Sequence, residues 1–442
     1  MADEEHLLLA LEDTSRTGVR VAGLRVLAAI VGFAATIVIA RALGPVGRGL
    51  YALPLAFLGI AMALSHVGLE SANMFLASHG LTLRRLWATS TVASLLVSGA
   101  AWATVAGASI LVGPTFVGGL PASWVGIALA QLPILLMTLY WTSVLQLDGA
   151  LAPTAVVTVV GTVANAAMVF AVGLAGALTP FRVLTLTWVT AGVTWILVLR
   201  LGMHRGIASL ATDRTLLARA IAFGLRAQLA TAFAFLLLRM DQVLVQGILG
   251  FRELGLYALT VVLAELLWLI TDPFAASLLP HQVRAGNGDE RRLGYATARL
   301  GLALSAILCL FVWIVAPHGI RFIYGEPFVD ATWPVRWLLP GVAAIAAQRP
   351  LYAIVTKEGR MGLAAAMNAA ALAVNLALNL LLLPAVGVVG AAIASTVTYL
   401  ILGVGYVLAT RRPGVVGWGD LVPRRDDLLL LSRALRRGAR GG

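Results

Sequence analysis

The sequence predicts an all-α membrane protein, with about 12 transmembrane helices in two parallel six-helix repeats around a central cavity. The first observation is composition: of 442 residues, 60% are hydrophobic and only 12% are charged, and the mean hydropathy is +0.93. A soluble domain needs far more surface charge than this. The second is that apolar runs close to the ~20 residues of a bilayer crossing recur along the whole chain. The third is an internal repeat.

The apolar runs predict twelve spans with short connections and no large domain outside the membrane. The expected spans cover residues 19–41, 49–77, 88–112, 123–147, 151–176, 182–202, 217–249, 254–280, 295–317, 332–355, 361–384 and 388–410. The predicted domains are an N-terminal tail, a six-helix bundle, a linker, a second six-helix bundle and a basic tail, over residues 1–18, 19–202, 203–216, 217–410 and 411–442.

The basic residues predict the orientation of the chain. The formal net charge is +12, and arginines gather in alternate loops and in the C-terminal tail. Because basic loops stay on the cytoplasmic side, both termini are expected there. The same clustering argues for a topology signal on an anionic inner leaflet and against a nucleic-acid partner. The only cysteine, Cys309, excludes disulfides and cysteine metal sites.

Two segments of the chain repeat each other. Leu43–Leu53 reads LGPVGRGLYAL and Leu249–Leu259 reads LGFRELGLYAL, with seven of eleven positions identical at an offset of 206 residues. At an offset of 210, Asp148–Gly149 matches Glu358–Gly359, and an asparagine recurs at 165 and 375. Six spans are an even number, so both halves are expected to insert the same way up, as a parallel repeat.

Ionisable residues inside the expected spans are the candidate functional residues, because charge in hydrocarbon is costly. Arg25 lies about two turns into the first span, where it either meets a phosphate or snorkels to the headgroups. His66, Glu70 and Asn73 fall on one face of the second expected helix. That face either lines a wet cavity, with Glu70 carrying a proton, or packs polar groups between helices.

The seventh expected span combines basic, acidic and amide side chains. On one continuous helix, a single polar stripe would hold Gln228, Arg239, Gln242 and Gln246, while Arg226 and Asp241 lie on another side. Arg239 is near the middle of the bilayer. It is expected to present guanidinium donors to a phosphate, or to pair with an acid such as Glu265, Asp272 or Glu70.

The eighth expected span places Glu265, Trp268 and Asp272 at i, i+3 and i+7. Two acids and a ring on one face suit ion coupling and stacking on a sugar. Alternatively, Asp272 caps a broken helix and Trp268 only packs. The predicted substrate-binding set is Arg25, Asn73, Arg226, Gln228, Arg239, Gln242 and Trp268. The predicted ion-coupling set is His66, Glu70, Asp241, Glu265 and Asp272.

Three stretches resemble the polysaccharide-transporter, or O-antigen flippase, family. They are Ala40–Leu53; Arg239-Met-Asp241 with Leu249-Gly250 and Gly255–Ala258; and Asn375–Tyr399, NLALNLLLLPAVGVVGAAIASTVTY. The resemblance implies the fold of the multidrug/oligosaccharidyl-lipid/polysaccharide exporter superfamily and flipping of undecaprenyl-diphosphate-linked sugars. Twelve spans suit this branch better than the lipid II flippase branch, which usually has fourteen.

The expected function is therefore a flippase that moves a lipid-linked oligosaccharide from the inner to the outer leaflet of a bacterial cytoplasmic membrane by alternating access. Expected partners are that glycolipid, membrane lipids, H⁺ or Na⁺, and glycan-assembly proteins. No catalytic residue, metal or cofactor is expected, and no P-loop is present. The alternatives are an ion-coupled multidrug exporter, and a membrane glycan polymerase or ligase. The enzyme would use outer-loop acids such as Glu326 and Asp330.

Overall fold

The computed structural model describes residues 2–113, 119–284 and 289–411, without the side chains of 2–22, 25, 111–112, 226–227, 269–284, 289–290 and 292. Within these ranges the chain forms helices and no strand. It divides into two compact units. One is Gly23–Ala258, and the other comprises the described residues from Leu259 onward with the start of the first helix. The predicted boundary over residues 203–216 stays a prediction.

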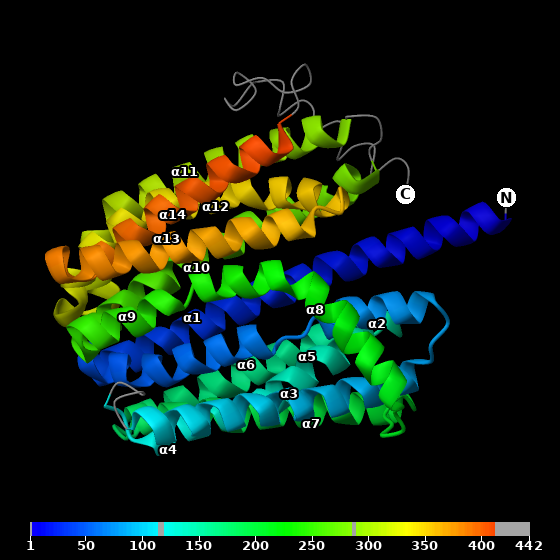
Figure 1. Cartoon of the computed structure of the whole chain (residues 1–442), viewed down its shortest axis with the longest axis horizontal. Coiled ribbons are helices and arrows are strands. Elements are labelled where there is room, and N and C mark those ends of the chain that lie inside the picture. The colour runs from blue at the N-terminus through cyan, green and yellow to red at the C-terminus, as the bar shows by residue number, and fades with distance from the viewer. Residues whose placement is uncertain (1, 114–118, 285–288, 412–442) are drawn as a thin grey trace. The chain divides into compact units, whose positions relative to one another are not determined.

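The N-terminal unit contains most of α1 and seven shorter helices that follow it (Figure 1). Their bounds are α1 Ala2–Ser65, α2 Leu69–Ser78, α3 Leu83–Val112, α4 Ala122–Ala130, α5 Leu132–Leu147, α6 Leu151–Leu174, α7 Pro180–His204 and α8 Arg214–Leu237. The unit also holds α9, Met240–Leu249, and the first turns of α10, Phe251–Arg284. Asp213 begins α8 by accepting a hydrogen bond from the Thr215 amide, and the Thr215 hydroxyl and amide hold the pKa of the Asp213 carboxyl below its ordinary value.

The C-terminal unit contains the rest of α10 and four longer elements, in which α12 packs against both α11 and α14 (Figure 1). Their bounds are α11 Asp289–Tyr324, α12 Thr332–Lys357, α13 Met361–Val386 and α14 Val388–Thr410, with a 3-10 turn over Glu326–Ala331. Pro340 and Pro350 lie inside α12. Small residues such as Gly341 bring its backbone close to Thr396 of α14.

Ten segments of the described residues are long and apolar enough to cross a membrane, and the chain is a multi-pass membrane protein. Three of the twelve expected spans account for the difference of two. The spans over 19–41 and 49–77 merge into one segment, Val26–Ser78. The span over 254–280 falls in α10, where side chains from residue 269 on lie outside the described part.

The long segment Val26–Ser78 is two crossings joined at a kink. At 1.5 Å per residue, 53 residues would extend ~80 Å, far more than the ~30 Å of hydrocarbon. Gly44 interrupts α1 with φ 65° and ψ −178°, a conformation that only glycine adopts readily, and Pro45 follows it. The prediction of a separate loop over residues 42–48 is wrong, because the chain turns within a single residue there.

The internal repeat is present in the backbone. Gly250, the counterpart of Gly44, has φ 95° and ψ −175° and separates α9 from α10 as Gly44 divides α1. The two repeated segments also pack on each other reciprocally. A Cβ added at Gly49 would lie 1.8 Å from the Phe251 carbonyl oxygen, and one added at Gly255 would lie 1.8 Å from that of Pro45. Gly49 and Gly255 are equivalent positions of the repeat, and so are Pro45 and Phe251, so the same contact is made twice.

The segments that match at an offset of 210 residues also have matching structure. Asp148 and Glu358 end α5 and α12, and the glycines after them have φ 79° and 70°. The next residues, Ala150 and Arg360, share φ −85° with ψ 38° and 41°. The asparagines at positions 165 and 375 each donate to a hydroxyl of the following helix, at Thr190 and Ser395 respectively. The two halves therefore build the same turn and helix pair.

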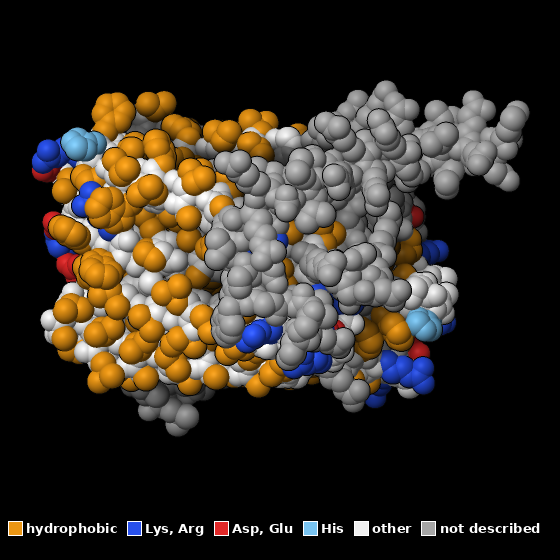
Figure 2. Space-filling view, turned by 90° about the horizontal axis from the view of Figure 1, so that it is seen from above, with side chains coloured by type: hydrophobic (Ala, Val, Ile, Leu, Met, Phe, Trp, Pro, Cys, Tyr) orange, Lys and Arg blue, Asp and Glu red, His pale blue; other side chains and the backbone are white. Residues whose placement is uncertain are grey.

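The outward faces of the helices carry large apolar side chains, as a lipid-facing surface requires. On α11, Ile307, Leu310, Phe311 and Ile314 form one exposed stripe at i, i+3, i+4 and i+7. On the face seen in Figure 2, hydrophobic side chains predominate and the described charged ones lie mostly near the ends of the helices.

Candidate functional site

The second expected span is interrupted at His66–Gly68, so the prediction of one continuous helix over 49–77 is wrong. α1 ends at Ser65 and α2 begins at Leu69, after Gly68 with φ 65°. The cause is a close approach to α8. A Cβ on Gly68 would lie 2.5 Å from the Gly224 carbonyl oxygen, and a Cβ on Gly224 would lie 2.0 Å from that of Val67. Two glycines let the backbones meet where a helix would clash.

This interruption brings together His66 and Glu70, two of the predicted ion-coupling residues. His66 Nε2 lies 2.7 Å from Glu70 Oε2, with the histidine ring largely buried and the carboxylate about one-third exposed. The ring of Tyr140 on α5 lies 5.7 Å from the histidine ring, and the tyrosine hydroxyl accepts a hydrogen bond from the Val67 amide at 3.2 Å. An acid, an imidazole and a phenol therefore cluster at a helix break.

Asn73 lies one turn further along α2 and is fully buried. Its amide nitrogen donates to Ser90 Oγ of α3 at 3.1 Å and to Ser143 Oγ of α5 at 3.2 Å. Its carbonyl oxygen has no partner among the described residues. These bonds join three helices as interhelical polar contacts do in membranes. The predicted contact of Asn73 with substrate stays a prediction.

Replacing Tyr140 by phenylalanine tests the interruption. The variant leaves the buried Val67 amide without its acceptor, so we expect a loss of ~1–3 kcal/mol in unfolding free energy, measured by thermal or denaturant unfolding in detergent. Tyr352→Phe is the matched control, because its hydroxyl has no hydrogen-bond partner among the described residues. Equal stability of both variants would show that the hydroxyl does not hold the break.

The seventh expected span is also broken, at Leu238 and Arg239 between α8 and α9. The prediction of one polar stripe along a single helix is therefore wrong, because the helical angle is not carried across the break. On the N-terminal side, Gln228 is buried on α8. Gln242 and Gln246 are buried one turn apart on α9. The amides thus stay inside the protein, on two helices.

Arg239 is half-buried and takes the position before the first turn of α9, with φ −127° and ψ −26°. Its side chain lies along α1, where a Cβ added at Gly59 would be 3.7 Å from Arg239 Cγ and Cδ. The absence of a side chain at Gly59 leaves room for the arginine stem. A guanidinium at a helix N-terminus joins the positive end of the helix dipole, which favours anions.

Asp241 lies two residues after Arg239 and forms a buried acid–phenol pair with Tyr257 of α10. Asp241 is 1% exposed, and its carboxylate accepts hydrogen bonds from the Tyr257 hydroxyl and, at 2.8 Å, from the backbone N–H of Gln242. Tyr257 belongs to the repeated segment, and its counterpart is Tyr51. The residue equivalent to Asp241 is Ala35, so only the second repeat carries the acid.

In the C-terminal unit, Trp268 lies beside Arg349 of α12, whose guanidinium carbon is 5.9 Å from the ring centroid. Glu265 is half-buried one turn before it. Arg25, Arg226 and Asp272 lie outside the side chains that the structure describes. Sequence reasoning missed Tyr140, Tyr257 and Arg349. Only Tyr257 had a signal, because it recurs in the internal repeat.

An open cavity of about 400 Å³ lies in the N-terminal unit, and the polar groups of its lining are amides and hydroxyls. Gln131 contributes a buried amide nitrogen without a partner among the described residues. Each threonine hydroxyl of the lining donates to a carbonyl of its own helix, so its oxygen can still accept a hydrogen bond. The polar lining residues are Thr36, Tyr51, Gln131, Thr158, Thr162, Asn165, Thr187, Thr190 and Thr194.

No family model and no curated protein matches the chain by sequence. Solved structures match its fold. A multidrug-resistance MATE family transporter of the MOP superfamily, in an inward-facing conformation, superimposes with a TM-score of 0.67 at 13% identity, over 87% of this chain and 94% of that one. A point mutant of the Vibrio cholerae MATE transporter VcmN gives 0.60 at 15% identity, over 91% and 99%.

The lipid II flippase MurJ, in an inward closed conformation, gives a TM-score of 0.65 at 10% identity, over 95% of this chain and 91% of that one. Drug exporters and a lipid flippase thus match about equally well. Identities this low bear on architecture alone. The chain has the helical fold of the MOP-superfamily transporters.

Proposed function

We propose that the chain is a flippase for a lipid-linked oligosaccharide, moving an undecaprenyl-diphosphate-linked glycan from the inner to the outer leaflet of a bacterial cytoplasmic membrane with both termini cytoplasmic. The supporting observation is Arg239. It is a half-buried guanidinium at the start of α9, beside Gly59 and close in sequence to buried amides. This arrangement suits a phosphate-bearing headgroup better than a cationic drug, since guanidinium binds phosphate oxygens in a bidentate way.

The interruptions in spans two and seven support a transport role. Non-helical backbone at membrane depth is tolerated where protein buries it or where it lines a cavity, and broken helices are typical of substrate sites in transporters. In this proposal Arg239, Gln228 and Gln242 contact the diphosphate, and Asn73, Arg25, Arg226 and Trp268 complete the substrate path. Each break would also let a helix bend as the chain alternates between a state open to the inside and a state open to the outside.

Coupling to H⁺ or Na⁺ is proposed at two acidic groups. Asp241 is buried against Tyr257, and Glu70 is paired with His66 beside Tyr140. A carboxylate held by hydrogen bonds inside a membrane protein is a reasonable carrier for one proton, because its charged form is costly there. Glu265 and Asp272 are further candidates. No ATP-binding motif is present in the sequence, which agrees with an ion-driven or assembly-driven process.

A second candidate is an ion-coupled multidrug exporter. The buried acid Asp241 and the fold shared with MATE transporters favour it. A cation-accepting cavity needs acids that outweigh bases around the drug. Export of a lipophilic cation such as ethidium, measured in cells expressing the chain, would support this candidate.

The test of the flippase is the leaflet on which the glycolipid accumulates when the gene is deleted in its own host. We expect undecaprenyl-diphosphate-linked glycan to build up on the cytoplasmic leaflet, where probes added to intact cells do not reach it. A plasmid copy of the gene should restore export. Build-up on the outer leaflet would instead indicate a polymerase or ligase and contradict the proposal.

A further inference from the structure

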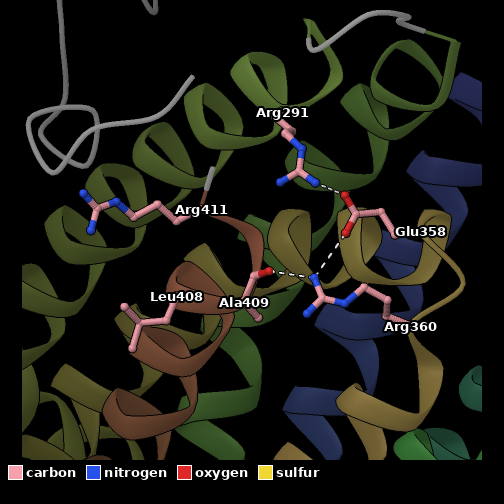
Figure 3. A pocket seen from close by; sticks show the side chains of 6 residues that line it. All are labelled: Arg291, Glu358, Arg360, Leu408, Ala409 and Arg411. Carbon is pink, nitrogen blue, oxygen red and sulfur yellow. Dashed lines mark hydrogen bonds and ion pairs between the residues drawn. The ribbon is translucent and has the colours of Figure 1, made fainter. Parts of the chain in front are cut away.

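A basic pocket of about 640 Å³ lies in the C-terminal unit, where α11 begins, α12 and α14 end, and α13 begins. Figure 3 shows its lining: three arginines, Arg291, Arg360 and Arg411, with Glu358 and the last turn of α14. The three guanidinium groups and one carboxylate give a formal excess of positive charge. None of these residues belongs to the proposed transport path.

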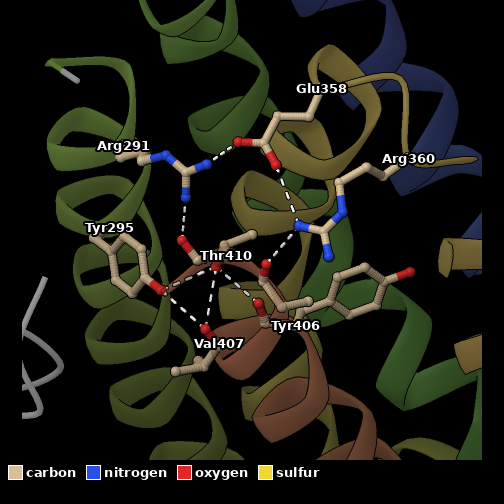
Figure 4. A network of polar contacts seen from close by, with 8 residues as sticks. Arg291, Tyr295, Glu358, Arg360, Tyr406, Val407 and Thr410 are labelled. Carbon is tan, nitrogen blue, oxygen red and sulfur yellow. Dashed lines mark hydrogen bonds and ion pairs between the residues drawn. The ribbon is translucent and has the colours of Figure 1, made fainter. Parts of the chain in front are cut away.

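Part of this charge is used to close the ends of helices (Figure 4). Arg291 is buried and donates to the Thr410 carbonyl oxygen and to Glu358. Arg360 Nη1 donates to the Ala409 carbonyl oxygen at 2.8 Å and lies 3.3 Å from Glu358 Oε2. The arginines thereby offset the negative ends of α12 and α14, which would otherwise repel an anion from the pocket.

Arg360 keeps an unused face. Both of its bonds to the protein come from Nη1, so Nε and Nη2 have no partner among the described residues, and 45% of its side chain is exposed. The Nε–Nη2 edge is a fork of parallel donors that fits two oxygens of one phosphate. Arg360 also precedes the first turn of α13, whose amides add a positive helix end to the same place.

The internal repeat shows that the turn itself does not require this arginine. Ala150 occupies the equivalent position of the first half with the same backbone conformation, φ −85° and ψ 38° against φ −85° and ψ 41°. The acid before it is retained in both halves, and Asp148 pairs with Arg205 at 2.7 Å. A basic residue at position 360 therefore serves something other than the turn.

The position along the helices indicates which ligands reach the pocket. The candidate membrane spans of α11 to α14 run over Leu293–Tyr324, Glu326–Lys357, Met361–Val386 and Val388–Thr410, and each has one end at this pocket. Four helix ends together mark the boundary of the hydrocarbon, where the phosphates of membrane lipids lie.

We propose that this pocket binds a phosphate monoester headgroup, with the Nε–Nη2 edge of Arg360 as its principal donor. The binding is independent of the proposed transport function and can be measured without transport. A lipid such as phosphatidic acid presents this group at the membrane boundary, and inorganic phosphate presents the same oxygens from solution.

The experiment measures binding of phosphatidic acid to the purified full-length chain in detergent by native mass spectrometry. We expect Arg360→Ala to weaken binding at least fivefold and Arg360→Lys to weaken it less, because lysine keeps the charge but loses the fork. Arg205→Ala is the matched control: it removes one positive charge at the equivalent junction of the first half, and it should change binding by less than twofold. Arg360→Gln serves if the alanine variant folds poorly.

Added inorganic phosphate identifies the source of the headgroup. Displacement of the lipid by millimolar phosphate would mean that the phosphate group alone suffices, and resistance to displacement would mean that the lipid is required; both support the site. Unchanged binding in the Arg360 variants would overturn the proposal. So would equal weakening by Arg205→Ala, since that would indicate diffuse attraction between a basic protein and an anionic lipid.

Discussion

Gly49→Ala and Gly255→Ala are each expected to destabilise the protein strongly or to prevent its accumulation in the membrane. The added methyl would lie 1.8 Å from a backbone carbonyl oxygen, at Phe251 and Pro45 respectively. A carbonyl in a packed helix cannot rotate away as a flexible side chain can, so the two segments must separate. Overpacking of this kind costs ~1–3 kcal/mol or more. The measurement is folded yield and thermal stability in detergent.

Whether a glycine-to-alanine change lowers or raises stability shows whether the added methyl clashes with a neighbour. In a helix interior, replacing glycine by alanine stabilises by about 0.5–1 kcal/mol when space allows. Gly247→Ala on α9 is the control, because a Cβ there meets nothing within 4 Å. We expect that variant to be as stable as wild type or slightly more so. If Gly49→Ala behaved like Gly247→Ala, the close crossing of the repeated segments would be wrong.

The internal repeat was the feature of the sequence that predicted most structure. Identical residues at an offset of 206 predicted equivalent backbone, and Gly44 and Gly250 share an unusual conformation. Their mutual contact was not predictable. The sequence shows that two segments are alike, but it does not indicate that like segments touch. That contact depends on how helices far apart in the chain cross, and glycine only permits it.

The two helix interruptions were poorly predictable from the local sequence. Gly68 is a weak signal for the first break, since a glycine within an apolar span is usually tolerated. The second break has no signal at all, because neither Leu238 nor Arg239 favours a helix end. Its backbone is closed by short-range bonds, with the Arg239 amide donating to the Leu236 carbonyl oxygen at 3.1 Å. Periodicity therefore predicted both spans and missed both interruptions.

The sequence revealed the charged candidate residues, because burying a charge in a membrane costs free energy, but it did not reveal the residues that contact them. A charged side chain in an apolar run is conspicuous, so His66, Glu70, Arg239 and Asp241 all stood out. Tyr140 and Tyr257 did not, because a tyrosine in a membrane helix is ordinary. The structure shows that these phenols complete the two acidic groups, one beside His66 and the other on Asp241.

Arg239→Ala is expected to reduce export of the lipid-linked glycan by more than about tenfold while the protein still reaches the membrane. Removal of the guanidinium takes away the charge-assisted donors proposed to hold the diphosphate, and such bonds contribute about 1.5–3 kcal/mol each. Arg239→Lys should restore only part of the activity, because lysine keeps the charge but not the paired donors. The measurement is the rate of glycolipid export in the deletion strain, normalised to the amount of folded protein.

The control for Arg239 must remove a charge without removing the site. Arg84→Ala does so at the exposed start of α3, in the same unit, and it should leave export unchanged. If Arg239→Ala exported the glycolipid normally while Asp241→Asn did not, the arginine would be structural and only the proposed ion-coupling acid would belong to the transport path. If both variants exported normally, neither residue would be part of the transport path. The comparison therefore decides whether the Arg239 guanidinium contacts the transported glycolipid, which the shared fold leaves open.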